Sequence, residues 1–167
     1  MLPMKRKTSP LTMFFALSLA GFLPVLAGGR GESASKPPKV PATWTLDAPA
    51  AAGPGDTVEL SLTLQPKSGI KVNRYPQIAW SITSDDNPVA GDVKSKLGSD
   101  GALPFDAPDA DRYFKSIDPI VMNVRLDPQA APGDHKLKTR LKYFYCVTKS
   151  GFCAPAKVSV EVPIRIE

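Results

Sequence analysis

The sequence predicts an all-β protein, an antiparallel immunoglobulin-like β-sandwich with a disulfide hairpin near its C-terminus. Seven or so short segments alternate apolar with polar residues, and turn-forming residues separate them. The chain has 167 residues with 18 scattered prolines and no sustained helical period, which argues against long helices. Its two cysteines, Cys146 and Cys153, are too close in sequence for the antibody-type bridge across the core. A jelly roll or a small barrel would fit the same strands.

The first half of the chain supplies the clearest strand. Trp44 and Leu46 open an apolar alternation, and the Gly- and Pro-rich segment 50–56 turns the chain. Four apolar residues then alternate with polar ones, as in a strand with one buried face: Val58, Leu60, Leu62 and Leu64. Shorter strands are expected at 70–73 and 78–82. Segment 84–111 is rich in Asp, Gly and Pro, so we expect long loops there, with a strand near 93–97.

The second half predicts a strand at 120–126 and then two long strands that form a hairpin. Residues 135–145 and 157–166 each alternate apolar with polar residues, and Ser150-Gly151 supplies the bend between them. Continuing both alternations to the turn places Cys146 and Cys153 on the polar side, close enough to bridge and open to solvent. Pro155 or a bulge would interrupt the alternation of the second strand before it reaches Cys153.

The chain divides into three parts. Residues 1–27 have the form of a secretory signal peptide, with a basic start, an apolar run and the small-residue site Val25-Leu26-Ala27. Residues 28–41 read as a flexible Pro/Gly-rich tether, and 42–167 as the folded domain. No later segment approaches the roughly 20 apolar residues that span a bilayer, so we expect a soluble periplasmic protein. An uncleaved amino-terminal anchor is the alternative, disfavoured by Pro24 and the small residues after it.

Charge and the remaining polar residues exclude several functions. The net charge of +5 includes three basic and no acidic residues of the signal, which leaves +2, too little to suggest nucleic acid. His135 is the only histidine, and no nucleophile motif accompanies it. The acidic residues of segment 85–111 lack the spacing of a calcium loop, and two cysteines with one distant histidine make a poor zinc site. No metal or cofactor is expected.

The two cysteines are therefore the main candidates for chemistry. In an exported chain they most often form a structural disulfide, here one that clamps the hairpin. A loop this short limits the entropic stabilisation to about 2.5 kcal/mol, and a domain of this size should not need it. Nearby side chains favour an exchange role, because cations stabilise a thiolate and aromatic surface can dock a partner: Lys142, Lys149, Lys157, Phe144 and Phe152.

The hairpin resembles the amino-terminal periplasmic domain of the thiol:disulfide interchange protein DsbD. Tyr145-Cys146 and the run Ser150-Gly151-Phe152-Cys153-Ala154-Pro155 are similar to that family's pattern of cysteine, short turn, Gly-aromatic-Cys and proline. Gly69 to Asn73 is similar to its glycine-led strand, and Asp111 to Phe114 falls where it has a cap loop. The likeness spans roughly 44–166. The six residues between the cysteines slightly exceed the usual number.

The resemblance implies a periplasmic thiol-disulfide exchange module. Cys146 and Cys153 would be its redox pair, with Cys153 attacked by the donor and Cys146 resolving. Tyr113 and Phe114 would shield the pair, although Phe105 could serve as cap instead. The donor would be a thioredoxin-like protein or a membrane electron carrier, and oxidised periplasmic proteins would be recipients. The chain ends at Glu167 without the family's membrane and thioredoxin-like domains, so we expect the donor to be a separate protein.

The sequence leaves one alternative from another functional class. This is a non-catalytic exported β-sandwich that binds a protein or ligand through loops such as 84–111, with the disulfide as a structural clamp. Whether the chain is an enzyme therefore depends on whether a foreign thiol reaches the cysteine pair.

Overall fold

The computed structural model describes residues 40–104 and 106–167. The predicted signal peptide, most of the predicted tether and Phe105 lie outside the described residues. The strands of the described part are β1 (Ala42–Asp47), β2 (Ala51–Ala52), β3 (Thr57–Pro66), β4 (Ile70–Val72), β5 (Ile78–Ile82), β6 (Val93–Leu97), β7 (Ile120–Arg125), β8 (Gly133–Val147) and β9 (Cys153–Ile166). Two short helices accompany them, the 3₁₀ helix η1 (Ser84–Asp86) and α1 (Asp109–Arg112).

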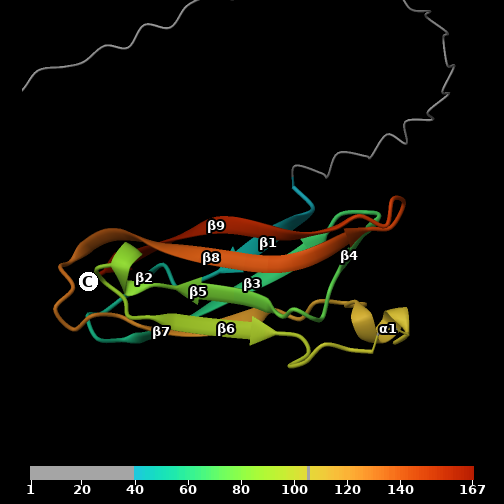
Figure 1. Ribbon diagram of the computed structural model, residues 1–167. Helices are drawn as coiled ribbons and strands as arrows, with labels where there is room; N and C mark the ends of the chain where they lie inside the picture. The colour runs from blue at the N-terminus through green and yellow to red at the C-terminus, as the bar shows by residue number, and fades with distance from the viewer. Residues whose placement is uncertain (1–39, 105) are drawn as a thin grey trace, which may run out of the picture. The chain divides into compact units, whose positions relative to one another are not determined.

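The strands form two sheets, which confirms the predicted β-sandwich (Figure 1). One sheet has the order β1-β3-β7, and the other has the order β2-β9-β8-β5-β6, with β4 also paired to β8. Pairing is antiparallel except between β2 and β9, which run parallel. The two-residue strand β2 falls where the sequence predicted only a turn. Consecutive alanines in a Gly/Pro-rich segment do not predict a strand. The strand forms here because Ala51 and Ala52 pair with the end of β9.

The core lies between the sheets and follows the alternation seen in the sequence. On β3 the four predicted inward residues, Val58 to Leu64, are buried, and β7, β8 and β9 contribute facing apolar side chains. Trp80 on β5 is fully buried, and its Nε1 donates a hydrogen bond of 2.7 Å to Oγ1 of Thr139. Thr139 in turn donates to the carbonyl of Val160, 2.9 Å away. The polar atoms inside this part of the core are therefore paired, as burial requires.

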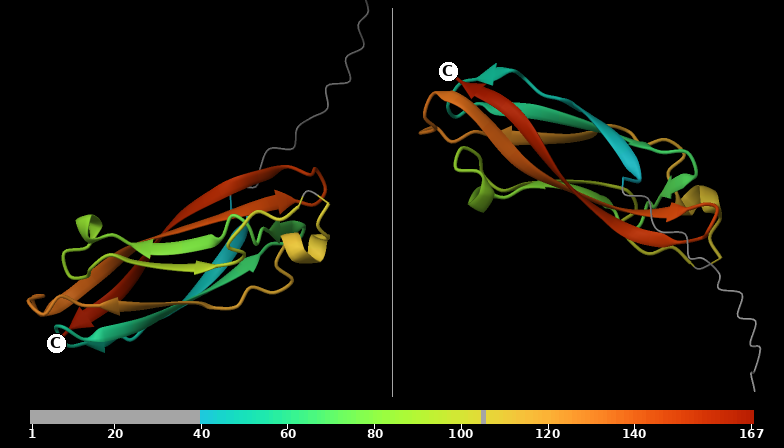
Figure 2. Two further views of the ribbon diagram at one scale, coloured as in Figure 1. Left: turned by 60° about the horizontal axis from the view of Figure 1, so that its bottom comes forward. Right: turned by 90° about the horizontal axis from the view of Figure 1, so that it is seen from above.

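The longest feature is the hairpin of β8 and β9 (Figure 2). The cysteines lie at its tip, Cys146 near the end of β8 and Cys153 at the start of β9. The register of the hairpin runs without a bulge from Gly133 opposite Ile166 to Cys146 opposite Cys153. The predicted bend lies at 148–151, and Gly151 takes a positive φ of 67°, which glycine adopts without steric cost. Because no bulge interrupts β9, Pro155 does not break the alternation.

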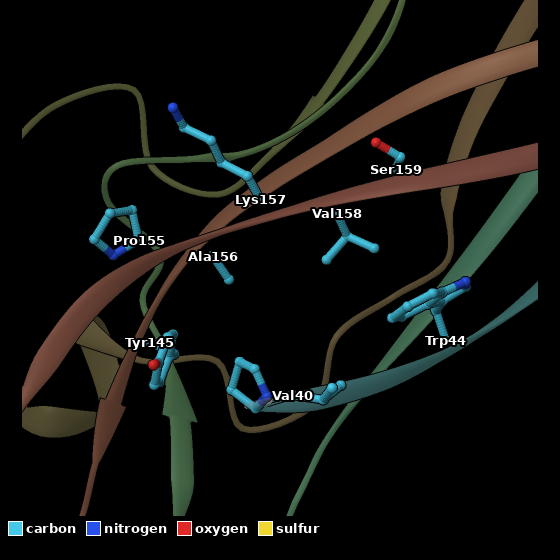
Figure 3. Close-up of a pocket in the computed structure, with 9 residues that line it drawn as sticks. Val40, Trp44, Tyr145, Pro155, Ala156, Lys157, Val158 and Ser159 are labelled. Carbon is cyan, nitrogen blue, oxygen red and sulfur yellow. The ribbon is translucent and has the colours of Figure 1, made fainter. Parts of the chain in front are cut away.

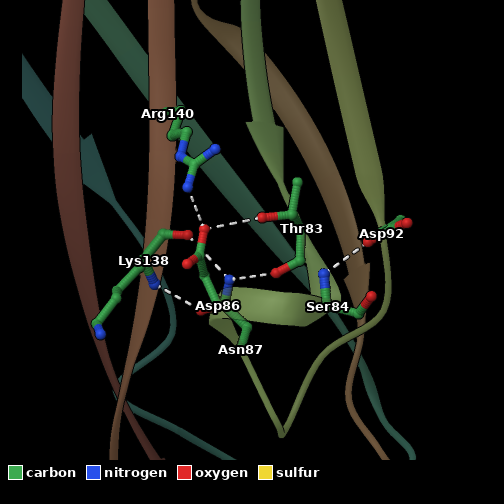
Figure 4. Close-up of polar contacts among 7 residues, drawn as sticks. All are labelled: Thr83, Ser84, Asp86, Asn87, Asp92, Lys138 and Arg140. Atoms are coloured by element: carbon green, nitrogen blue, oxygen red, sulfur yellow. Dashed lines mark hydrogen bonds and ion pairs between the residues drawn. The ribbon is translucent and has the colours of Figure 1, made fainter. Parts of the chain in front are cut away.

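The segment between β5 and β7 is irregular, as predicted, and includes β6 at the expected place. Its first part is fixed to β8 by polar contacts (Figure 4). Asn87, only 2% exposed, accepts a hydrogen bond of 2.6 Å from the backbone N–H of Lys138 and donates to the carbonyls of Thr83 and Lys138. Asp86 pairs with Arg140. These contacts therefore connect the loop that follows β5 to β8. Among the described residues, no helix has the length and apolarity needed to cross a membrane.

Candidate functional site

The two cysteines form a disulfide between the last paired residues of β8 and β9. The Sγ atoms of Cys146 and Cys153 are bonded at 2.02 Å, and their Cα atoms are 4.0 Å apart. Two backbone hydrogen bonds close the tip beyond the bridge, and a third joins the tip to the chain before β4. The N–H of Val147 donates to Phe152, that of Gly151 donates to Val147, and that of Thr148 donates to Gly69. The hairpin tip is thus a defined element that is also joined to the chain leading into β4.

The two sulfur-bearing residues differ in exposure. Cys146 is 5% exposed, whereas Cys153 is exposed at the open side of the tip beside Phe152, itself 40% exposed. The sequence predicted both cysteines to be open to solvent, and for Cys146 this is wrong. Cys146 does lie on the outward-facing side of β8, but another segment of the chain covers it. Of the two cysteines, Cys153 is therefore the one on the solvent side of the bridge, while Cys146 is sheltered.

The cover over Cys146 is built from Asn73 and Tyr113. These two residues form an isolated antiparallel bridge, flanked by hydrogen bonds from Arg74 N–H to Arg112 and from Phe114 N–H to Val72. The N–H of Asn73 also donates to the carbonyl of Phe144 on β8, at 2.9 Å. Segment 112–114 is therefore laid beside 72–74, which is itself laid beside β8. This layering covers an outward-facing residue, and strand alternation alone could not reveal it.

The side chains of the cover touch the buried sulfur directly. The Tyr113 hydroxyl lies 3.6 Å from Cys146 Sγ and can donate a hydrogen bond to it. Oδ1 of Asn73 lies 3.5 Å from the same sulfur. The oxidised sulfur carries no proton, so this amide oxygen becomes a hydrogen-bond acceptor only for the reduced thiol. The cover thus offers a hydrogen-bond donor, the Tyr113 hydroxyl, to a Cys146 thiolate and an acceptor, Asn73 Oδ1, to a Cys146 thiol.

A lysine opposite the disulfide holds the cover in place. Lys71 on β4 is the register partner of Cys146, and its Nζ forms an ion pair of 2.5 Å with Asp109 at the start of α1. The same Nζ lies 5.1 Å from the centroid of the Tyr113 ring. The hydrogen bond from Lys71 and its charge lower the pKa of the Asp109 carboxyl. Lys71 therefore connects α1 and Tyr113 to β8, the strand that carries Cys146.

Of the two predicted shielding residues, Tyr113 contacts the disulfide and Phe114 packs elsewhere. Phe114 is partly buried against the hydrophobic core, and the guanidinium carbon of Arg74 lies 5.7 Å from its ring centroid. A shielding role for either residue stays a prediction. Strand alternation does not single out Lys71, Asn73 or Asp109, although the glycine-led segment 69–73 resembles a strand of the DsbD family. The missing information was which strand lies beside β8.

The other candidate groups lie in structural roles. His135 is far along β8 from the tip, and its Nε2 lies 2.8 Å from the carbonyl oxygen of Ala131. The acidic residues Asp86 and Asp109 pair with Arg140 and Lys71. Within 40–104 and 106–167, no three His, Cys, Asp or Glu side chains come together in a way that could hold a metal ion. The disulfide with its cover is thus the best-defined chemical site of the described domain.

Comparison with known proteins gives distant structural similarities and no family. Neither the known protein families nor the curated proteins contain a match to this chain. Among solved structures it is similar to AggA, the major subunit of aggregative adherence fimbriae type I from Escherichia coli, at 13% identity and a TM-score of 0.37. That alignment covers 76% of this chain and 95% of AggA.

A second similarity is to a chain of the Coh-OlpA-Doc918 type I cohesin-dockerin complex from Clostridium thermocellum. The identity is 14% and the TM-score 0.34, with 75% of this chain and 99% of the other covered. The resemblance to the DsbD amino-terminal domain therefore stays a prediction from the residues around the cysteines.

Proposed function

We propose that the protein is an exported thiol-disulfide exchange module whose redox pair is Cys146 and Cys153. The observation that carries this proposal is the asymmetry of the disulfide. One sulfur-bearing residue, Cys153, is exposed, while the other, Cys146, is buried with a tyrosine hydroxyl 3.6 Å from its Sγ. A bridge that only braced a hairpin would need neither the exposed residue nor a hydrogen-bond donor aimed at the buried one.

The reaction begins when a thiolate of a reduced thioredoxin-like donor attacks Sγ of Cys153. A sulfur–sulfur bond forms between donor and Cys153 as the Cys146–Cys153 bond breaks, and the electron pair of the broken bond goes to Cys146. The Tyr113 hydroxyl donates a hydrogen bond to the resulting thiolate. Hydrogen bonding of this kind stabilises a leaving thiolate relative to the intact disulfide.

The mixed disulfide is then resolved by the donor's second thiol. As a thiolate it attacks the donor sulfur bound to Cys153, so the donor leaves as a disulfide and Cys153 leaves as a thiolate. Both cysteines take up protons from solvent, and the thiol of Cys146 can donate to Oδ1 of Asn73. The domain has then gained two electrons and two protons. The reverse sequence passes them to an oxidised exported protein.

The proposal includes the location and the partners predicted from the sequence. The signal-like sequence of residues 1–27 supports a periplasmic location, where a thioredoxin-like protein or a membrane electron carrier would reduce the domain. Oxidised periplasmic proteins would be its recipients. The supporting observation is again the exposed Cys153, because both classes of partner must reach the same sulfur.

Mixed-disulfide trapping tests the proposal. The full protein carrying Cys146→Ser, which keeps the exposed Cys153, is mixed with a thioredoxin-like protein whose resolving cysteine is replaced by serine and whose remaining thiol is activated. We expect a covalent complex that reductant dissolves. The matched control, Cys153→Ser, leaves only the buried Cys146 and should trap far less. Absence of any complex, with a wild-type reduction potential below about −300 mV, would identify the bridge as structural.

A second candidate function is non-catalytic binding, with the disulfide as a clamp. The observation in its favour is apolar exposure around the same end of the domain, where Tyr75 and Leu103 are 40% and 37% exposed and line one shallow pocket with Asn73. The double variant Cys146→Ser/Cys153→Ser separates the two functions. A binding domain would retain its ligand with some loss of stability, whereas an exchange module would keep its fold and lose all exchange.

A further inference from the structure

Strand β9 has an open edge in the middle of its length. One edge of β9 pairs with β8 throughout, while the other pairs only with β2, at Ala51–Ala52 opposite Arg165 and Ile166. In the part of the chain that the structure describes, no strand pairs with that outer edge before Arg165. An unpaired edge of this kind is a template for another strand.

The printed hydrogen bonds establish which residues face the open edge. The N–H of Arg165 donates to Ala50 and that of Glu167 to Ala52, so odd-numbered residues of β9 point their backbone groups outward. Residues two apart on a strand share this direction, and the register has no bulge. Lys157, Ser159 and Glu161 therefore present N–H and C=O groups to solvent.

Two prolines bound this open stretch. Pro155 and Pro163 also occupy outward-pointing positions, and neither has an N–H to donate. Between these two prolines, a strand added to β9 would therefore find donors at 157, 159 and 161. Pro155 and Pro163 stand at equal distances on either side of Ser159, so the open stretch is symmetric about that residue.

An apolar groove lies beside the same edge. It has a volume of about 470 Å³ and is lined by β1 on one side and β9 on the other, with Trp44, Ala156 and Val158 among its walls. Figure 3 shows Trp44 and Val158 on the two strands that border it. Both side chains are only partly buried. A strand added at the β9 edge would extend its sheet over this groove and cover part of their apolar surface.

The charges on β9 are complementary to those of a second β9. Lys157 and Glu161 lie two residues on either side of Ser159, and both side chains are exposed. We propose that a second copy of this chain pairs here, β9 against β9 in antiparallel orientation, on a twofold axis through Ser159. Lys157 then lies opposite the second copy's Glu161, and the reverse pair forms by symmetry.

The same register satisfies the backbone and the apolar face. Residues 157, 159 and 161 of each copy exchange hydrogen bonds, about six in all, and the prolines end the ladder at both sides. Val158 lies opposite the second copy's Val160 on the face toward the groove. Because β2 already covers the edge from Arg165 onward, pairing is confined to 157–161 and the chains diverge beyond.

One unfavourable contact within the domain supports this partner. Lys157 is the register partner of Lys142 on β8, which places two like charges directly opposite each other. Glu161 is the acidic residue of this part of β9. Its Oε2 lies 3.0 Å from Nζ of Lys136. In the dimer each Glu161 lies beside Lys157 of the other copy and offsets the repulsion. Cys153 lies outside the ladder, so the dimer does not depend on the proposed exchange function.

Analytical ultracentrifugation of the full protein, over about a hundredfold range of concentration, tests the proposal. We expect a concentration-dependent monomer–dimer equilibrium. Lys157→Glu and Glu161→Lys should each weaken dimerisation by about tenfold or more, because each places like charges opposite one another. The double variant Lys157→Glu/Glu161→Lys should restore it. Lys115→Glu, a charge reversal of an exposed lysine between α1 and β7, should leave it unchanged.

A backbone variant provides a second readout. Ser159→Pro removes the central outward donor without removing a hydrogen bond to β8, and should abolish the dimer. Circular dichroism and the thermal midpoint of each variant report whether the fold is retained. Lys157→Glu places a carboxylate opposite Lys142 and so removes a like-charge pair within the domain. A loss of dimerisation in this variant would therefore not come from a less stable fold. A protein that stays monomeric throughout, or a dimer indifferent to both the charge reversals and the proline, would overturn the proposal.

Discussion

The hydroxyl of Tyr113 lies 3.6 Å from the Sγ atom of Cys146, although 33 residues separate the two in sequence. The contact exists because segment 112–114 pairs with 72–74, and 70–72 pairs with the end of β8. Three stretches distant in sequence thus meet at one sulfur. In the proposed exchange reaction, this is the sulfur that must accept the electron pair, so the contact has a direct chemical consequence.

Replacing Tyr113 by phenylalanine should slow reduction of the disulfide. The variant keeps the ring over Cys146 and loses the hydrogen bond to the developing thiolate, and a bond to a charged group contributes about 1.5–3 kcal/mol. Part of that is regained from solvent, so we expect a decrease of about 3- to 30-fold in the rate of reduction by dithiothreitol. The thiolate absorbance of the reduced protein should also titrate at higher pH. Tyr75→Phe, an exposed tyrosine, is the control, and an unchanged rate in Tyr113→Phe would contradict a role for the hydroxyl.

Replacing Lys71 by methionine should loosen the cover. The variant keeps the length of the side chain and removes the ion pair with Asp109 and the charge near the Tyr113 ring. Because solvent screens this pair, global stability should change little. The expected change is local, namely faster alkylation of Cys146 in reduced Cys153→Ser protein. Alkylation that is no faster than in protein with Lys71 intact would show that the cover does not depend on this pair.

The same ion pair predicts a dependence on acid. Lys71 lowers the pKa of Asp109 in the folded protein, so the pair stabilises the cover above the ordinary carboxyl pKa of about 4 and is lost as pH falls through the lowered value. Alkylation of Cys146 in Cys153→Ser, corrected for the thiolate fraction, should therefore rise at acidic pH. Lys71→Met should remove that rise. Nuclear magnetic resonance titration of Asp109 should show its pKa returning upward in the variant.

Reducing the disulfide should leave the domain folded. The bridge closes a short loop, for which the chain-entropy relation limits the stabilisation to about 2.5 kcal/mol. The β8–β9 register continues for thirteen more residue pairs beyond the cysteines, so most of the hairpin does not depend on the bridge. Urea unfolding of wild type with and without reductant, and of Cys146→Ser/Cys153→Ser, should show this small loss. Global unfolding upon reduction would instead indicate a structural clamp.

Strand alternation was sufficient to predict the sandwich and the hairpin, because apolar faces at β3, β7, β8 and β9 determine which side of each strand is buried. It was insufficient for the site. The alternation places Cys146 on an outward face, and only the strand order reveals that Asn73 and Tyr113 cover it. Lys71 carried no signal of its own, since a lysine in a short strand most often faces solvent. What the sequence lacks is the neighbour relation between β4 and β8.

The buried Tyr143 predicts how the core responds to alkali. Its hydroxyl has no hydrogen-bond partner among the described residues, and burial, with a smaller contribution from Tyr145, raises its pKa to about 12. The unfolded chain titrates near 10, so it releases the proton first. Stability is then unaffected below pH 10 and falls by up to about 1.4 kcal/mol per pH unit between 10 and 12.

Tyr143→Phe tests this expectation. The variant removes an unpaired buried hydroxyl while filling almost the same space, so it should be at least as stable as wild type at neutral pH. Urea unfolding between pH 8 and pH 11, with about unit steps, should show a shallower loss of stability for the variant. Tyr75→Phe, which alters an exposed tyrosine, should follow wild type. Equal slopes for wild type and Tyr143→Phe would mean that water reaches the hydroxyl in the folded protein and that its pKa is close to that of a free tyrosine.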